Sequence, residues 1–369
     1  MSEEKKLLEL TKKLITIPSI SGDKNQNDIV LDYVKHYLSS PDILTQEFTV
    51  NNVRSIAFYP KNSLKVLDII FHGHTDVVPA NTENDFEPYV KNNNLYGRGS
   101  CDMKGGLAIL MVLFKTLIKA GNNRVALFVT SDEEVGGKNG TKFLFDELKP
   151  ETKFFLTAEG SEGSNILKYK QKGVFQFQLE VQGIGGHAGY TWAGENAINK
   201  LYEVYSKIET LFPENKSDKD HWYTTINLAT IRGGTVSNAI PDYAIADINI
   251  RFADDWKSEE KILKAIRRII KQTPKTTITV TGSTPMIVNK KTNPLIVKLN
   301  KIACQELHLD KDLYFRNHGT NDARFAAAVG IPAVGFGPVG KNCHAKNEYI
   351  SIASLKHYFN IYKKFVESF

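Results

Sequence analysis

Three nearly continuous apolar runs, each ending at acidic or histidine residues, constrain the fold of this chain most strongly. The runs are VLDIIFHGH, RVALFVTSDEE and KFFLTAEG, and they lead to His74, to Glu133 with Glu134, and to Glu159. Uninterrupted apolar stretches of this length are typical of strands buried on both faces of a sheet. We therefore predict a layered α/β domain in which polar side chains follow the ends of buried strands.

Helical patterns separate these strands. Apolar residues recur at helical spacing over residues 7–17, where Pro18 ends the helix, and again over residues 27–38 and 103–120. In sheets of this kind, sites lie beyond the carboxyl ends of the strands. We expect the polar strand ends to gather there, with Asp102 opening the helix over 103–120.

The pattern changes near residue 172. The segment GVFQFQLEVQG alternates apolar and polar residues, which indicates a strand with one exposed face. Two helical patterns and three further strands follow, which predicts a small α+β domain over residues 172–284. The α/β pattern then resumes. We therefore predict a catalytic domain in two parts, residues 1–171 and 285–369, interrupted by the inserted domain.

Charge and hydropathy exclude several classes of protein. The net charge is +6, but Lys and Arg are spread along the chain, and the densest basic stretch, residues 261–275, has isoleucines at helical spacing. A solvated helix face explains this stretch better than a nucleic-acid site, so the excess charge suits an acidic substrate. No apolar run reaches the roughly 20 residues of a membrane span. The N-terminus has acids where a signal peptide has basic residues, so we expect a cytoplasmic protein.

The three cysteines, Cys101, Cys304 and Cys343, form no CxxC motif. An odd and sparse set argues against a disulfide framework and for a reducing compartment. Cys101 and Cys343 each directly precede a candidate metal ligand, but neighbouring side chains of an extended segment point apart. We expect both to be small packed residues. If the fold brings the two together, oxidation can disturb the site.

The segment HGHTDVVP carries the first candidate ligand. A histidine that binds metal through one nitrogen needs an acceptor for its other N–H, and Asp76 suits this role for His74. His72 is predicted to be a packed or hydrogen-bonded strand residue. Asp102 can bridge two cations with its two oxygens. Helix capping is the alternative for Asp102, but it does not explain the four glycines that lie on both sides of Asp102 within GRGSCDMKGG.

Glu133 and Glu134 are adjacent acids directly after a buried strand, where they repel each other unless cations compensate. One can bind metal while the other accepts a proton from water whose pKa the metal lowers toward roughly 7. That acid can then pass the proton to a leaving nitrogen. A solvated turn is the alternative. With Glu159 and His344 added, the residues predict a site for two divalent cations and a metal-dependent hydrolase.

His187 lies between glycines in GIGGHAG, within the predicted insertion. It can donate a hydrogen bond to a developing oxyanion. A turn histidine without a catalytic role is an equal alternative from the residues alone.

These motifs together resemble the dinuclear zinc aminoacylase and carboxypeptidase family, which includes succinyl-diaminopimelate desuccinylase, acetylornithine deacetylase and the glutamate carboxypeptidases. GHTDVVP, GRGSCDMKGG, SDEEVGG and GHAG occur in the family's order, and the similarity runs from about residue 5 to the C-terminus. The resemblance implies a zinc-exopeptidase-like catalytic domain, with a mixed sheet flanked by helices. It also implies that the inserted α+β domain is a lid and dimerisation domain, and hence a homodimer.

The resemblance also implies roles for single residues. The implied ligands of two zinc ions are His74 and Glu159 for one ion, Glu134 and His344 for the other, and Asp102 as the bridge. Cobalt or manganese are alternatives for such a donor set. Glu133 would be the general base and later the acid, and Asp76 would orient His74. His187 would stabilise the oxyanion, in dimeric relatives across the subunit boundary.

Three residues are implied to contact substrate: Asn238 in GGTVSNAIPD, Arg251 in NIRF at a carboxylate-binding position, and Thr320 in GTNDARF. Two departures from the family touch the same pocket. GTNDARF stands where the desuccinylases have GTSDGRF, and GHAGYTWAGENA lacks the proline that follows the histidine in relatives.

The sequence thus predicts a metal-dependent hydrolase that cleaves the amide bond of an N-acyl amino acid, first of all an N-succinyl-diaminopimelate-like one. Acetylornithine-type deacetylation and hydrolysis of a small dipeptide, as by a dipeptidase or carboxypeptidase, are alternatives. A non-catalytic metal-binding protein of the same fold is a further alternative, which the loss of a ligand or of the base would favour. The sequence retains all of these residues.

Overall fold

The computed structural model describes residues 2–213 and 222–369. The chain divides into two compact units. Unit 1 comprises Met1–Tyr169, Val288–Phe315 and Asn321–Phe369, and unit 2 comprises Lys170–Ile287 and Arg316–Thr320. The predicted insertion, residues 172–284, falls inside unit 2. The short segment Arg316–Thr320 also belongs to unit 2, although the sequence placed it within the second part of the catalytic domain.

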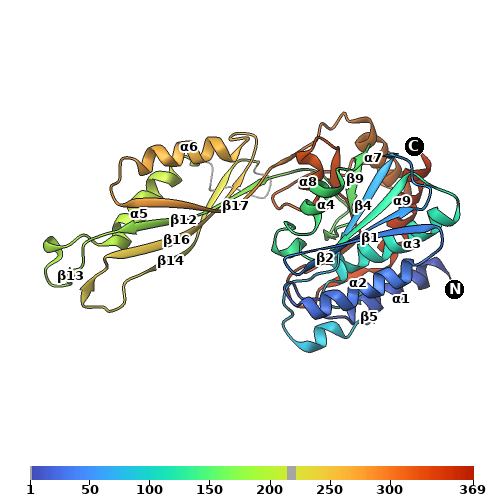
Figure 1. Ribbon diagram of the computed structural model, residues 1–369, viewed down its shortest axis with the longest axis horizontal. Helices are drawn as coiled ribbons and strands as arrows, with labels where there is room; N and C mark the ends of the chain where they lie inside the picture. Colours follow the sequence, from blue (N-terminus) through green and yellow to red (C-terminus); the bar gives the residue numbers. More distant parts are fainter. Residues whose placement is uncertain (1, 214–221) are drawn as a thin grey trace. The chain divides into compact units, whose positions relative to one another are not determined.

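Unit 1 is built on a mixed sheet with helices on both faces (Figure 1). In sheet order, its strands are β1 (Ile43–Val50), β2 (Val53–Pro60), β7 (Val125–Thr130), β4 (Ile69–His74), β9 (Phe155–Thr157), β20 (Ala333–Gly335) and β11 (Leu167–Gln171). The four strands β7, β4, β9 and β20 run parallel, and the outer strands are antiparallel to their neighbours. β4 and β7 are buried along their whole length, as the apolar runs predict.

The helices of unit 1 cover both faces because of the strand order. The chain passes from β4 through α3 (Gly105–Lys119) to β7 on one side, and from β7 through α4 (Thr141–Leu148) to β9 on the other. Right-handed crossovers in opposite directions place α3 and α4 on opposite faces. The remaining helices are α1 (Glu3–Ile15), α2 (Lys24–Leu38), α7 (Pro294–Glu306), α8 (Ala323–Ala328) and α9 (Ile352–Glu367). α1, α3 and α9 pack against one another, and α8 packs against α4.

Small sheets complete unit 1. One contains β10 (Ser161–Glu162), β21 (Val339–Lys341), β22 (Tyr349–Ser351), β6 (Asn94–Tyr96) and β5 (Tyr89–Lys91), and another pairs β3 (Val66–Leu67) with β8 (Glu151–Thr152). The strand predicted over residues 66–73 is therefore interrupted. The break falls at Asp68, whose buried carboxylate pairs with Arg124 at 2.6 Å and with Lys153 at 2.7 Å.

Unit 2 is an antiparallel sheet with two helices. Its sheet order is β14 (Thr225–Gly233), β16 (Tyr243–Phe252), β12 (Gly173–Gln182) and β17 (Thr276–Thr284), and its helices are α5 (Ala197–Glu209) and α6 (Glu259–Ile270). Alternate residues of β12, including Phe175, Phe177 and Leu179, are buried in the core with both helices, which confirms the half-exposed strand. In the basic helix α6, only Ile262 and Ile266 are buried, as expected of a solvated helix face.

The short strands β13 (Gly186–His187) and β15 (Ala239–Ile240) pair within unit 2, and β18 (Ile287–Val288) and β19 (Tyr314–Asn317) lie where the chain passes between the units. The hairpin β1–β2 was not predicted. Its turn residues, Asn51 and Asn52, have positive φ angles of 49° and 67°, as tight hairpin turns require. Within residues 2–213 and 222–369, no helix combines the length and apolar character needed to cross a membrane.

Candidate metal centre

The polar residues predicted at strand ends meet at one edge of the unit 1 sheet. β4 lies between β7 and β9 and runs parallel to both, so the residues that follow the three strands lie at the same edge. His74 is the last residue of β4 and pairs in register with Thr130, the last residue of β7. Glu133 begins a 3-10 turn, Glu133–Val135, directly beyond β7. The predicted arrangement of strand ends is confirmed.

Three side chains form a group that could hold a metal ion: Asp102, Glu134 and His344 each offer a ligand atom, and these atoms lie within 4.8 Å of one another. Nε2 of His344 lies 3.1 Å from Oε2 of Glu134 and 3.3 Å from Oδ2 of Asp102. Nε2 of His74 lies 3.1 Å from Oδ1 of Asp102. The two oxygens of Asp102 therefore face two different histidines.

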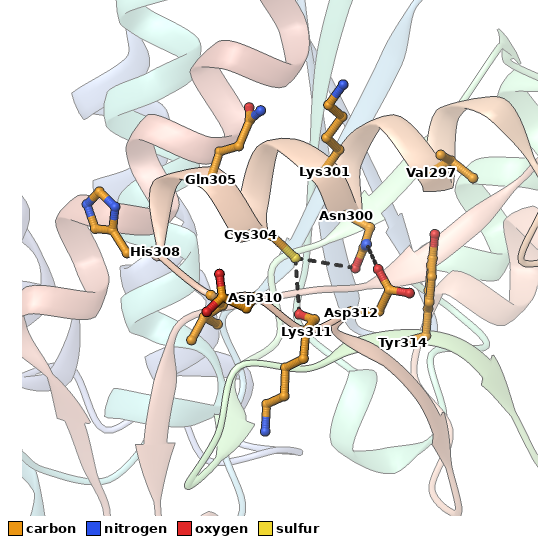
Figure 2. Close-up of a pocket in the computed structure, with 11 residues that line it drawn as sticks. Val297, Asn300, Lys301, Cys304, Gln305, His308, Asp310, Lys311, Asp312 and Tyr314 are labelled. Atoms are coloured by element: carbon orange, nitrogen blue, oxygen red, sulfur yellow. Dashed lines mark hydrogen bonds between the residues drawn. The ribbon is translucent and has the colours of Figure 1, made fainter.

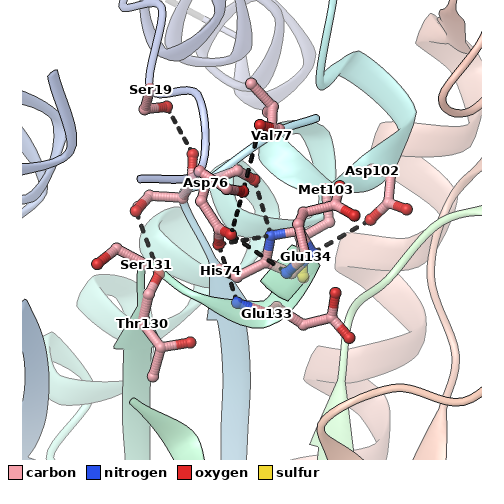
Figure 3. Close-up of polar contacts among 12 residues, drawn as sticks. Ser19, His74, Asp76, Val77, Asp102, Met103, Thr130, Ser131, Glu133 and Glu134 are labelled. Carbon is pink, nitrogen blue, oxygen red and sulfur yellow. Dashed lines mark hydrogen bonds and ion pairs between the residues drawn. The ribbon is translucent and has the colours of Figure 1, made fainter. Parts of the chain in front are cut away.

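Asp76 holds this edge together through hydrogen bonds to the main chain (Figure 3). Its carboxylate accepts the backbone N–H groups of Glu133 at 3.2 Å and Glu134 at 3.1 Å, and the hydroxyl of Ser21 at 2.8 Å. Nδ1 of His74 lies 3.0 Å from the backbone carbonyl of Asp76 and 3.4 Å from its carboxylate. Asp76 thus orients His74 chiefly through its carbonyl, and its carboxylate positions the two glutamates.

Asp102 lies in an irregular turn, Ser100–Lys104, and does not cap the helix that follows, because α3 begins only at Gly105. The Asp102–Met103 peptide bond is cis. The buried carboxylate of Glu348 accepts the N–H groups of Gly99 at 2.9 Å, Cys101 at 2.9 Å and Asp102 at 3.1 Å. Arg98 pairs with the same carboxylate at 2.7 Å. Glu348 thereby fixes the backbone that carries Asp102.

Two candidate residues have other partners near this group. The carboxylate of Glu159 lies 2.9 Å from Nζ of the buried Lys168, and Glu159 is not part of the three-residue group. Oε1 of Glu133 lies 3.8 Å from Nη1 of Arg324, whose Nη2 lies 3.1 Å from Asp322. Glu133 therefore faces a buried ion pair and takes no part in the group formed by Asp102, Glu134 and His344.

Burial raises the pKa of Glu133 well above its usual range, and the nearby charge of Asp322 adds to this effect. Burial also raises the pKa of Glu134 to about 7, although a hydrogen bond with His344 opposes the shift. Hydrogen bonds to Asp102 and Glu134 raise the pKa of His344 to about 11. For His74, burial alone lowers the pKa, but its bond to Asp102 and the charge of Asp76 outweigh burial and raise it.

These shifts describe a cluster of acids whose negative charge is reduced by protons, held both by the glutamates themselves and by the two histidines. A divalent cation compensates such a cluster more fully, because it carries two positive charges and binds carboxylate oxygen and imidazole nitrogen directly. Oxygen and nitrogen donors of this kind suit zinc, cobalt and manganese. The residues that are present therefore fit a divalent cation.

His72 lies within β4 and takes no part in the group. It is fully buried, and its ring nitrogens lie 3.0 Å from the hydroxyl of Thr157, 3.1 Å from that of Thr130 and 2.9 Å from that of Thr141. The prediction of a hydrogen-bonded strand residue is confirmed.

Unit 2 contains the remaining candidate residues, and it brings His187 and Asn238 together. His187 pairs with Ala239 between β13 and β15, and the carbonyl of Asn238 accepts the N–H of Ala188 at 2.9 Å. Nδ1 of His187 accepts the N–H of Gly189 at 3.0 Å. Because Nδ1 is an acceptor, Nε2 of a neutral His187 carries the proton and is able to donate. Both His187 and Asn238 are exposed.

Arg251 and Thr320 also belong to unit 2. Nε of Arg251, on β16, donates to the side chain of Asn249 at 3.1 Å. Its charge lies near Lys172, which is 1% exposed. Burial lowers the pKa of Lys172 to about 8, and Arg251 adds to that effect. Oγ1 of Thr320 is buried and has no hydrogen-bond partner among the residues that the structure describes.

Sequence reasoning missed three residues of this edge: Glu348, Asp322 and Arg324. Glu348 lies four residues beyond His344 in the stretch KNEYI, which carries no motif. Asp322 and Arg324 occur in GTNDARF, close to the predicted substrate contact Thr320. Charged residues at that place in the sequence could have pointed to them as part of the site. All three act on other groups through buried contacts, which sequence spacing does not reveal.

The fold and the site define a class: a two-unit α/β hydrolase with a carboxylate and histidine cluster suited to divalent cations. The model of Peptidase family M20/M25/M40 matches residues 70–368. The chain belongs to this family. It is therefore a metal-dependent hydrolase of amide bonds, as the sequence predicts.

Individual proteins resemble the chain over nearly its whole length. A succinyl-diaminopimelate desuccinylase of Blochmanniella floridana is 29% identical over 392 residues, covering 98% of this chain and 98% of that protein. Among solved structures, a tripeptidase from Staphylococcus aureus has a TM-score of 0.81 at 20% identity and covers 100% of both chains. An M20 family metallo-carboxypeptidase from Sulfolobus solfataricus has a TM-score of 0.78 at 17% identity, covering 100% of this chain and 99% of that one. These structures confirm the predicted fold class.

Proposed function

We propose that this protein uses two divalent cations, zinc in the first instance, to hydrolyse an N-acyl amino acid of the N-succinyl-diaminopimelate type. The observation that supports this most is the convergence of Asp102, Glu134 and His344, with ligand atoms within 4.8 Å, beside a second histidine at the same sheet edge. The similarity to a desuccinylase over 98% of both chains supports the acyl group. The net charge of +6 suits an anionic substrate.

We assign the ligands as the sequence predicts. His74 and Glu159 would hold one cation, Glu134 and His344 the other, and Asp102, whose two oxygens face different histidines, would bridge them. Glu159 would then have to share its carboxylate with Lys168, its present partner at 2.9 Å. When bound, the cations supply Lewis acidity, which polarises an amide carbonyl and lowers the pKa of water.

The proton transfers are assigned to Glu133. Its carboxylate accepts a proton from the attacking water and later delivers that proton to the leaving nitrogen. Two contacts hold Glu133 in place. Its backbone N–H donates to the carboxylate of Asp76 at 3.2 Å, and its carboxylate lies 3.8 Å from the guanidinium of Arg324. His187 donates from Nε2 to the developing oxyanion, since Gly189 already occupies Nδ1. Asn238, Arg251 and Thr320 are assigned to the substrate.

Metal analysis combined with a substrate panel tests the proposal. Purified protein should contain two divalent cations per chain and should hydrolyse N-succinyl-diaminopimelate faster than N-acetylornithine or a set of dipeptides. A chelator should abolish activity, and added zinc should restore it. Preference for N-acetylornithine or a dipeptide would refute the assignment of a succinyl group. If the protein, fully loaded with cations, hydrolysed no amide at all, the proposal that it is an enzyme would be refuted.

We further propose a cytoplasmic homodimer formed through residues 172–284. The resemblance to dimeric members of the family supports the dimer, since their oxyanion histidine acts across the subunit boundary. Sedimentation of the purified protein tests this assignment. A single species with the mass of one chain at micromolar concentration would contradict it.

A further inference from the structure

Two cysteines of unit 1 meet beside the candidate metal group. Sγ of Cys343 lies 2.7 Å from Sγ of Cys101, although 242 positions separate them in sequence. Cys101 directly precedes Asp102, and Cys343 directly precedes His344. Both cysteines are present as free thiols. An approach of less than about 1 Å would bring the two sulfurs to the bond length of a disulfide.

Packing decides which cysteine can move. Cys101 is fully buried, and glycines pack against its sulfur on two sides. An ideal Cβ at Gly160 or at Gly340 would lie 2.8 Å from Sγ of Cys101. Both glycines therefore lie close to the sulfur, which limits how far the buried Cys101 side chain can shift. Cys343 must therefore make the approach.

Cys343 lies in the exposed loop that joins β21 and β22. Its N–H donates to Oε1 of Glu162 at 2.9 Å, and the residues on either side of it, Asn342 and His344, have φ angles of 60° and 64°. The side chain of His344 is 52% exposed. A short backbone adjustment in an exposed loop disturbs few contacts, so the Cys343 sulfur can close the gap.

We propose that Cys101 and Cys343 form a reversible disulfide that ties the His344 loop to the buried turn carrying Asp102. The two thiols lose two protons and two electrons, one S–S bond forms, and a peroxide such as hydrogen peroxide is reduced to two molecules of water. The pair lies one residue away from Asp102 on one side and from His344 on the other. The bond therefore acts on the loop without replacing either ligand.

The geometry indicates that oxidation preserves the site. The sulfurs are already in contact while His344 lies 3.1 Å from Glu134 and 3.3 Å from Asp102, so the bond requires little movement of these ligand atoms. It removes instead the conformations in which the loop swings His344 away. We expect on the order of tenfold slower loss of cation to a chelator, because a disulfide restricts the open ensemble. This effect, unlike the bond itself, rests on the proposed role of His344.

Cys304 provides the matched control. It is a residue of α7 that lines a separate pocket, where its sulfur is 3.3 Å from the carbonyl of Lys311 and 4.0 Å from the side chain of Asn300 (Figure 2). A Cys304→Ser variant removes one thiol without touching the pair.

The experiment treats zinc-loaded protein with hydrogen peroxide, removes the peroxide, and maps disulfides in unreduced peptides by mass spectrometry. The wild type and Cys304→Ser should contain the Cys101–Cys343 peptide pair, and dithiothreitol should remove it. Zinc release to a chromogenic chelator should be slower in these oxidised samples, whereas peroxide should not slow release from Cys343→Ser.

Absence of the peptide pair in the wild type, or faster zinc release from the oxidised protein, would overturn the proposal. Because the peptide map needs no intact site, it remains decisive if Cys343→Ser folds poorly. The proposed function fails separately. A protein that forms the disulfide but binds no zinc in either redox state would refute the metal centre and leave the cysteine pair standing.

Discussion

The candidate residues of unit 1 lie largely inside the protein, whereas His187 and Asn238 of unit 2 lie on exposed segments. His74 is fully buried, and the side chains of Asp102 and Glu134 are 17% and 6% exposed. His187 and Asn238 are exposed and are held by strands of only two residues. The contrast indicates that the fold itself holds the side chains proposed for the cations and the base, whereas those proposed for the oxyanion and the substrate are held by a few local contacts.

Within unit 1 the same contrast separates two histidines. His74 ends a buried strand, and its ring is bonded on both sides. His344 belongs to an exposed loop, and its ring bonds to the side chains of Asp102 and Glu134. We therefore expect that His74, which is built into the sheet, cannot be displaced without disturbing the fold, whereas His344 can move away while unit 1 stays folded.

The largest expected effect is the loss of the base in unit 1. The Glu133→Ala variant should still bind its cations, because the proposed ligands are unchanged. Its kcat should fall roughly 10²- to 10⁴-fold, because the group that transfers the proton is removed. Steady-state kinetics together with metal analysis measure this. Glu147→Gln, an exposed change on α4, is the control. Near-normal turnover in Glu133→Ala would show that the buried edge does not carry the chemistry.

The next effect separates the two histidines. His344→Ala should weaken cation binding on the order of 100-fold, because a ligand matters at least as much as the groups that orient it. Its apo form should unfold at nearly the wild-type temperature, since the side chain is half exposed. His74→Ala should lower both the cation affinity and the unfolding temperature, because its ring is fully buried and its removal leaves a cavity. Calorimetric titration measures the cation affinity and thermal unfolding measures the stability, with His36→Ala as the control. If the two variants were equally destabilised, His74 and His344 would not differ in their contribution to folding.

A smaller effect is expected from unit 2. Arg251→Ala should raise KM roughly 10-fold for substrates with an α-carboxylate and leave kcat nearly unchanged, because a charged hydrogen bond is lost in both ground and transition states. Substrates in which that carboxylate is amidated should be affected little. Arg268→Ala, on the exposed face of α6, serves as the matched control. A uniform loss across both substrate types would argue against the contact.

The smallest effect concerns Lys172, a buried residue of unit 2. Burial lowers its pKa in the folded protein to about 8, below the value in the unfolded chain. At pH values between the pKa of Lys172 in the folded state and its pKa in the unfolded chain, the folded state therefore binds fewer protons than the unfolded chain. Lys172 thus lowers the stability of the folded state below about pH 8, and this cost shrinks as the pH rises. Lys172→Met should be more stable than the wild type by about 1 kcal/mol at neutral pH. Thermal unfolding from about pH 6.5 to about pH 9.5 should show that advantage decline; an advantage independent of pH would refute it.

Much of the fold could be predicted from the sequence, because a strand that is buried on both faces is a continuous run of apolar residues. The apolar runs predicted β4 and β7, and the alternation of GVFQFQLEVQG predicted β12. The hairpin β1–β2 was not predicted, because no residue of β1 is fully buried and its alternation of exposure slips once. The helix predicted from residue 103 begins at Gly105, because bonds to Glu348 hold the preceding turn in a non-helical form.

The sequence by itself determined which residue types are available for the chemistry. It also determined that four of them, His74, Glu133, Glu134 and Glu159, stand at the ends of three buried strands, because periodicity and strand ends are local properties of the chain. Only the tertiary structure decided that Glu348 holds the Asp102 turn, that Arg324 faces Glu133, and that Cys101 meets Cys343. These contacts join positions far apart along the chain. They depend on how elements pack, and packing leaves no periodic mark on the residues that take part in it.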